Sequence, residues 1–158
     1  MKFKADFRKG NPEDHALILS SWLNGAYNHC SAFRDMPKSL FYGLHHVTCK
    51  RLLACSDTLL CVDAEDPHHV LGYLVYVNYK NFSVIHWIYV KQVFRKFGMG
   101  VELLKRANLH KPILTSHETF NSNMYFNRKG FATYHCPHFR HGDWHEDSLG
   151  VFLSSRSD

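Results

Sequence analysis

The spacing of apolar and polar residues predicts two kinds of element in the first third of the chain. Residues 1–8 alternate between apolar and polar side chains, which is the pattern of a strand with one solvated face. Residues 11–14 then combine an asparagine that can cap a helix, a proline that suits its first turn and two acids. We therefore expect a helix that continues to a break over residues 25–31, and a second helix from Pro37 to Leu53.

Each predicted helix has an apolar side that we expect to face the core. On the first helix this side comprises Ala16, Leu17, Leu19, Trp22 and Leu23, and on the second it comprises Leu40, Phe41, Leu44, Val47, Leu52 and Leu53. We expect the histidine pairs His45-His46 and His68-His69 to lie at the surface.

The remainder of the chain alternates between strand and helix patterns. This order predicts a single mixed α/β domain over residues 1–158. The expected strands are residues 57–63, 70–79, 84–90, 113–116, 131–134 and 148–154, and the expected helices run from residue 101 to about 110 and from 120 to 129.

Residues 85–107 read as a buried strand, a short basic turn and a helix, with the motif Arg95-x-x-Gly98-x-Gly100 at their centre. Free N–H groups at a helix start, the positive end of the helix dipole and neighbouring cations together favour an anion. Two glycines allow the backbone to approach such a ligand closely. The patterns of a dinucleotide-binding Rossmann turn and of a P-loop are both absent from the sequence.

The composition excludes some classes of protein but does not identify a ligand. The 158 residues carry a formal net charge of +5 with 13 histidines, which suits a phosphate-bearing ligand, a nucleic acid or an acidic protein. No apolar run is long enough for a membrane span, and the N-terminus lacks the apolar segment of a secretory signal. We therefore expect no membrane partner. The five cysteines form no CxxC pair, so we expect a reducing cytoplasmic location and no disulfide framework or cysteine-based zinc site.

Two motifs, together with the order of elements, resemble the GNAT superfamily, the Gcn5-related N-acetyltransferases. The segment VKQVFRKFGMGVELL is similar to that family's acyl-CoA pyrophosphate loop, and NSNMYFNRKGF is similar to its late helix ending in Tyr-x-x-x-Gly-Phe. The resemblance implies a mostly antiparallel mixed sheet flanked by helices, with a V-shaped split for acyl-CoA between residues 84–90 and 113–116. It also implies an enzyme that moves an acetyl group from acetyl-CoA to an amine acceptor, as a monomer or homodimer, and a phage or bacterial source.

The resemblance further implies which residues hold the co-substrate. Backbone groups of Tyr89, Val90 and Lys91 would pair with the pantetheine arm. The amides of Arg95, Lys96, Phe97, Gly98, Met99 and Gly100 would receive the pyrophosphate. Asn121 and Asn123 would contact the pantetheine amides, although residues at this point can equally serve as ordinary helix caps.

Three residues are candidates for the catalytic groups. His86 lies on the central strand and titrates near neutral pH, and strict alternation would place it on one face with Ile88 and Val90 and opposite Trp87. A hydrogen-bonded histidine without a catalytic role is the other interpretation. His117 and Glu118, at the end of the next strand, are the competing bases, and a water chain is a further route for the proton.

The chain differs from the family pattern at the residue that would act as the acid and protonate the leaving thiolate. Phe126 occupies the position of the family's tyrosine and cannot donate a proton, whereas Tyr125 is its neighbour. Adjacent residues on a helix point about 100° apart, so Tyr125 is not a simple replacement. Rotation of Tyr125 into the split, another group as the acid, unassisted loss of the thiolate, and loss of activity are the outcomes that this difference leaves open.

A histidine-rich loop and the net charge leave two alternatives beside the acyltransferase. The loop contains His135, His138, His141 and His145, so metal binding there is one alternative, but we assign no metal site and expect no metal requirement. A protein that modifies or binds nucleic acid on the same scaffold, without acetylation, is the alternative function.

Overall fold

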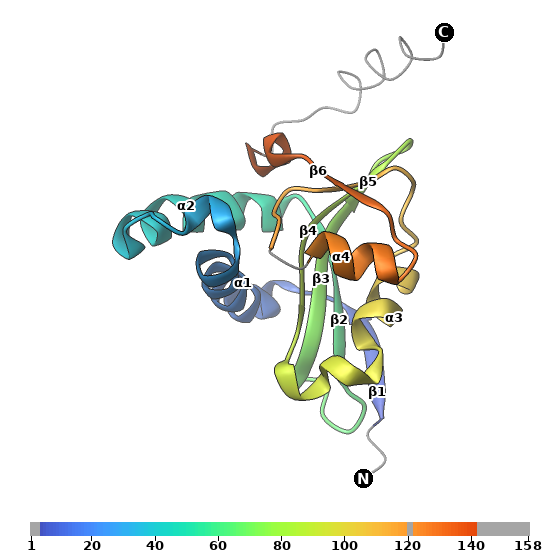
Figure 1. Ribbon diagram of the computed structural model, residues 1–158. Coiled ribbons are helices and arrows are strands. Elements are labelled where there is room, and N and C mark those ends of the chain that lie inside the picture. The colour runs from blue at the N-terminus through green and yellow to red at the C-terminus, as the bar shows by residue number, and fades with distance from the viewer. Residues whose placement is uncertain (1–3, 120–121, 142–158) are drawn as a thin grey trace, which may run out of the picture.

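A six-stranded mixed sheet forms the centre of the computed structural model, which describes residues 4–119 and 122–141 (Figure 1). The strands lie side by side in chain order, the first four antiparallel and the last two parallel to their neighbours. The strands are β1 (Ala5–Lys9), β2 (Asp57–Asp63), β3 (Val70–Asn78), β4 (Ser83–Val90), β5 (Ile113–Thr115) and β6 (Thr133–His135). The α-helices are α1 (His15–His29), α2 (Lys38–Ala54), α3 (Met99–Arg106) and α4 (Ser122–Arg128).

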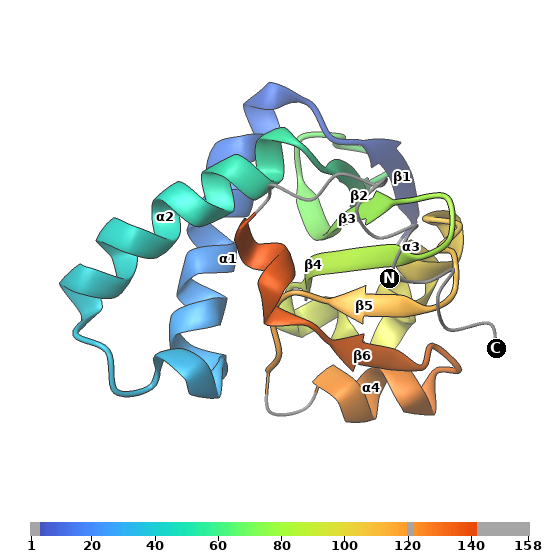
Figure 2. The same ribbon diagram turned by 90° about the horizontal axis from the view of Figure 1, so that it is seen from above.

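The helices cover the two faces of the sheet in pairs. Figures 1 and 2 show α1 and α2 on one face and α3 and α4 on the other. Two apolar clusters fill the spaces between the layers. The first includes Trp22, Phe41, Leu52, Tyr73 and Trp87, and the second includes Leu71, Leu74, Ile85, Leu103, Leu104 and Phe126. The predicted mixed, mostly antiparallel α/β architecture is thus confirmed.

The predicted start of the first helix is confirmed in detail. The Asn11 side chain accepts a hydrogen bond from the Glu13 N–H at 3.1 Å, and the Asp14 carboxylate accepts one from the Asn11 N–H at 2.9 Å. Together they satisfy donors that a helix start leaves unpaired, first in a short 3-10 turn (Pro12–Asp14) and then in α1.

The predicted break at residue 25 was wrong, because α1 continues through Gly25 to His29. A Cβ atom at Gly25 would lie only 2.6 Å from Cζ2 of Trp87 on β4. The glycine therefore lets the indole pack directly against the helix backbone, and it does not end the helix.

The predicted inward face of α2 was wrong in part. Leu40, Leu44 and Val47 are 50%, 59% and 54% exposed, and Leu17 of α1 is exposed as well. The buried positions of α2 are Phe41, His45, Cys49, Leu52 and Leu53. Apolar residues occur on both sides of this helix, and aromatic packing of Phe41 and His45 against Phe33 selects the side that carries His45. The expected surface position of His45 was therefore also wrong.

A β-bulge in β4 changes the direction of His86. Trp87 pairs with Val75 and Ile85 pairs with Tyr76, so His86 is an extra residue without a partner on β3. The bulge interrupts the alternation of the strand. His86 therefore lies with Trp87 against Trp22 of α1, whereas Ile88 packs on the opposite face, and the prediction that His86 and Ile88 share a face was wrong.

Some predictions fall on parts of the chain that the structure does not describe. The expected strand over residues 148–154, Asn121, and His145 of the histidine-rich loop all lie outside the described residues. Within the described ranges, none of the helices has the length and apolar character needed to cross a membrane.

Candidate active site

The sheet opens between β4 and β5. These two strands pair only over Ser83, Val84 and Ile85, and one further hydrogen bond joins the Ser116 N–H to the Ile85 carbonyl oxygen at 3.1 Å. Strand β4 continues to Val90, and none of the described residues forms a strand that pairs with this edge beyond Ile85. The second half of β4 therefore has one paired edge and one open edge, which is the predicted split.

The backbone groups on the open edge belong to alternate residues. The Lys91 N–H donates to the Leu71 carbonyl oxygen at 2.8 Å, so residue 91 is directed toward β3. Successive residues of a strand direct their backbone groups to opposite sides, so those of Val90 and Ile88 face the split. The Val90 carbonyl oxygen already accepts a hydrogen bond from Nε of Arg95 at 3.0 Å. Of the three predicted pairing residues, Tyr89, Val90 and Lys91, it is Val90 that faces the opening.

The turn that follows β4 is mostly exposed up to Gly98, and burial begins at Met99. A 3-10 helix (Gln92–Phe97) leads into Gly98, which has a φ angle of 76°, and α3 then begins at Met99. That left-handed conformation favours glycine. The first N–H groups of α3 have no partners within their own helix, and the exposed Arg95 and Lys96 add positive charge beside them.

Tyr125 lies directly over the start of α3. A Cβ atom at Gly100 would be 2.5 Å from the Tyr125 hydroxyl oxygen and 3.7 Å from Cγ2 of Val90, so the phenol reaches the place where β4 and α3 meet. Burial raises the pKa of Tyr125, which keeps its hydroxyl protonated at neutral pH. Phe126 is only 2% exposed and packs in the core, so the residue at the family's tyrosine position points into the interior.

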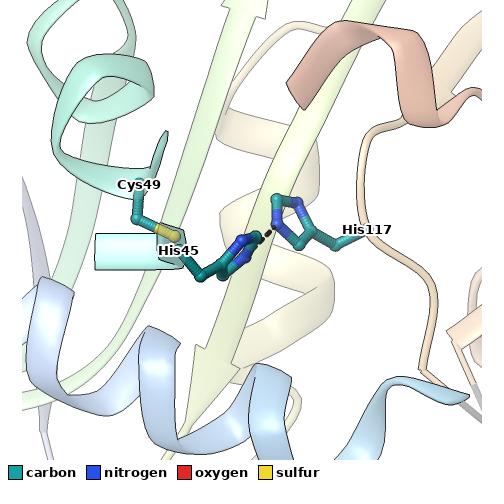
Figure 3. Close-up of side chains that lie close together, drawn as sticks. All are labelled: His45, Cys49 and His117. Carbon is teal, nitrogen blue, oxygen red and sulfur yellow. Dashed lines mark hydrogen bonds between the residues drawn. The ribbon is translucent and has the colours of Figure 1, made fainter. Parts of the chain in front are cut away.

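On the other face of the sheet, His86 begins a buried chain of polar side chains. Its Nδ1 lies 2.7 Å from Oγ of Ser116, and that oxygen lies 2.8 Å from Nδ1 of His117. The Nε2 atoms of His117 and His45 are 2.9 Å apart, as Figure 3 shows. The chain thus joins β4, the segment after β5, and α2.

Burial controls the protonation of these histidines. It lowers the pKa of His86 and that of His45 each to about 4, and it lowers the pKa of His117 well below its ordinary value. The positive charge of Arg140 lowers the pKa of His45 and His117 further. The chain is therefore neutral at physiological pH, with each hydrogen bond shared between one donor and one acceptor.

The remaining predicted site residues lie at the edges of this region. Glu118 follows His117 and is half-buried. Burial raises the pKa of nearby Cys30, and the charge of Glu118 adds to that rise. Asn123 belongs to α4. In the histidine-rich loop, His138 and Arg140 belong to a 3-10 helix (Pro137–His141), and Arg140 donates from Nε to the Ser116 carbonyl oxygen at 2.7 Å.

Solved structures with the same arrangement of elements include three proteins provisionally assigned as acetyltransferases. One from Pyrococcus furiosus matches with a TM-score of 0.62 and 17% identity, over 80% of this chain and 91% of that chain. One from Clostridium difficile 630 matches with a TM-score of 0.56 and 13% identity, over 81% and 90%. One from Clostridium acetobutylicum, solved with acetyl-CoA, matches with a TM-score of 0.51 and 13% identity, over 81% and 90%. The chain shares the fold of these three proteins, in line with the fold that the resemblance to the GNAT superfamily predicted. No family model and no curated protein matches the sequence.

Two features of the site could not be predicted from the sequence. The bulge at His86 leaves no signature in the residue pattern, and Ser116 is an unremarkable residue until the fold places it between two histidines. For the histidine on α2 the sequence held one signal. His45 and Cys49 are four residues apart on a predicted helix, which places both side chains on the same side of that helix.

Proposed function

We propose that this protein transfers an acetyl group from acetyl-CoA to an amine acceptor. The observation that carries the proposal is the open edge of β4, which runs directly into the basic glycine turn. An extended ligand arm with amide groups can add to such an edge as an extra strand. A pyrophosphate at its other end would then meet the free N–H groups at the start of α3.

The chemistry requires an oxyanion donor, a base and an acid. An amine attacks the thioester carbonyl carbon and forms a tetrahedral oxyanion. The carbon–sulfur bond then breaks, the amide remains on the acceptor, and the CoA thiolate takes a proton. The N–H groups of Ile88 and Val90 on the open edge are the donors available to the oxyanion and to the pantetheine amides. We assign the acid to Tyr125, which is protonated and lies at the mouth of the split.

Glu118 suits the role of base better than His86 does. The His86 ring is enclosed by Trp22 and Ser116 and has its pKa lowered to about 4, so it is a weak base that an acceptor would have difficulty reaching. Glu118 is only half-buried and follows β5 at the other side of the split. In this proposal the proton lost by the amine goes to the Glu118 carboxylate. His86 has a structural role, in which its hydrogen bond with Ser116 joins β4 to the segment after β5.

Isothermal titration with acetyl-CoA tests the co-substrate directly, and the chain offers a matched pair of variants. Gly98 and Gly130 have φ angles of 76° and 80°, and neither has a neighbouring atom within 4 Å of its would-be Cβ. Alanine should strain the backbone equally at both positions, at about 1 kcal/mol. We expect Gly98→Ala to lose acetyl-CoA affinity and Gly130→Ala to keep it. Equal affinity of both variants, or no binding by the wild type, would contradict the proposal.

The nucleic-acid alternative loses part of its support in the structure. Its basic N-terminal strand includes Arg8, which forms a bidentate ion pair with Asp14 through two contacts of 2.8 Å. That guanidinium is therefore already occupied by a carboxylate. Affinity for DNA or RNA that falls steeply with added salt would restore the alternative.

A further inference from the structure

We propose that His45, Cys49 and His117 bind a zinc ion that fastens α2 to the segment after β5. One donor atom of each residue lies within 4.8 Å of the other two, and all three residues are buried. Figure 3 shows Cys49 beside His45, and the His45 ring facing the ring of His117. The inference stands independently of the acyltransferase proposal.

The donor set selects the kind of metal. Two imidazole nitrogens and one thiolate suit Zn²⁺, whereas Mg²⁺ and Ca²⁺ take oxygen ligands. His45 and Cys49 are four residues apart on one helix, so both side chains lie on the same face without distortion.

The separation of the two imidazole nitrogens is close to that of a tetrahedral site. Two Zn–N bonds of about 2.0 Å at a tetrahedral angle place their nitrogens about 3.3 Å apart. The Nε2 atoms of His45 and His117 are 2.9 Å apart, so a small rotation of either ring would admit the ion between them. Zinc would replace the single proton that these two nitrogens share.

The surroundings of His117 prepare its Nε2 atom for a metal. Its Nδ1 atom lies 2.8 Å from Oγ of Ser116, which can accept the Nδ1–H, and Ser116 can in turn donate to His86 at 2.7 Å. In that arrangement the lone pair of His117 is on Nε2 and points at His45. Metal-binding histidines commonly have their second nitrogen held by such a partner.

Arg140 makes the thiolate essential. The positive charge of Arg140 acts on Cys49 and on both histidines. A buried cation close to that guanidinium needs a negatively charged ligand, and of the three residues only Cys49 can supply one, as a thiolate. Loss of Cys49 should consequently remove binding altogether.

Cobalt titration of the untagged, full-length protein after chelator dialysis tests the site. Tetrahedral Co²⁺ with a thiolate ligand gives visible bands and a sulfur-to-cobalt charge-transfer band, and we expect both to saturate at about one ion per chain. Zinc should displace the cobalt and raise the melting temperature. Because this measurement uses the wild type alone, it does not depend on whether any variant folds.

A matched pair of cysteine variants assigns the ligand. Cys49 and Cys61 are both fully buried, but Cys61 packs on the α3 face of the sheet. We expect Cys49→Ser to lose the charge-transfer band and the thermal shift with zinc, and Cys61→Ser to keep both. A wild type that gives no cobalt spectrum, or a Cys49→Ser variant that retains the charge-transfer band, would overturn the proposal and leave a hydrogen-bonded histidine pair only.

Discussion

The sites on the two sides of β4 differ in the groups that form them: backbone groups form one, and side chains form the other. On the α3 side, the candidate co-substrate site is made chiefly of backbone: the open strand edge, the Gly98 turn and the first N–H groups of α3. On the α1 and α2 side, the site is made of buried side chains, with His86, Ser116, His117 and His45 in one hydrogen-bonded chain. The first site depends on the path of the backbone, and the second depends on which side chains the chain carries.

The largest loss of acetyl-CoA affinity is expected from a side chain added at Gly100, at the start of α3. A Cβ atom at Gly100 would lie 2.5 Å from the Tyr125 hydroxyl, so Gly100→Val should displace the phenol and obstruct the turn. We expect acetyl-CoA affinity, measured by calorimetry, to fall about 100-fold or more.

Gly43 is the control for that variant. It lies in α2 with no atom within 4 Å of its would-be Cβ, so Gly43→Ala should bind normally and gain about 0.5–1 kcal/mol of stability. If Gly100→Val bound acetyl-CoA as the wild type does, the backbone account of this face would be wrong.

The next effect concerns Tyr125. Without its hydroxyl the thiolate must leave unassisted, so Tyr125→Phe should lower kcat about 100-fold while the KM for acetyl-CoA changes little. Burial raises the pKa of Tyr125, so activity should persist into alkaline pH and decline as the pH rises through that pKa. Tyr134→Phe, at an exposed tyrosine of β6, should be neutral. An unchanged kcat in Tyr125→Phe would assign the acid to another group.

A smaller effect, on the free energy of unfolding, is expected from the buried histidines as the pH falls. The pKa of His86 is lowered from 6.5 to about 4 by burial, so between these values the unfolded chain binds more protons than the folded one. Stability should be complete above about pH 6.5 and decline as the pH falls toward 4, by at most about 3 kcal/mol for this residue.

Urea unfolding at several pH values, with chelator present, measures that slope. His86→Gln should reduce it and leave the part that His45 and His117 contribute, whereas His68→Gln, at an exposed residue, should leave it as in the wild type. The same slope in both variants would show that His86 does not control acid stability.

The smallest effect is expected from the cations of the turn. Arg95 is exposed and donates to the Val90 carbonyl oxygen, so it adds charge to a site that the backbone already forms. Arg95→Gln should weaken acetyl-CoA binding about 3- to 10-fold at low salt and less at high salt. Lys50→Glu, on the exposed side of α2, is the control. A loss as large as that of Gly100→Val would mean that side chains dominate the turn.

The two faces also differ in how far the sequence reveals them. The turn was predictable because Arg95, Gly98 and Gly100 are neighbours in the chain and their conformational requirements are local. The helix start at Asn11 was predictable for the same reason. The direction of His86 depends on a bulge in the pairing of two strands, and the meeting of His45 with His117 joins residues 72 positions apart. Such contacts follow from packing, and spacing along the chain does not encode them.

Amide hydrogen exchange, followed residue by residue with and without acetyl-CoA, tests the central claim most directly. If the co-substrate adds to the open edge of β4 and its pyrophosphate binds the helix start, the amides of Ile88, Val90 and Gly98 to Val101 should become protected, while Tyr89 and Lys91 change little. Protection confined to another part of the molecule, or no change at saturating acetyl-CoA, would contradict the account.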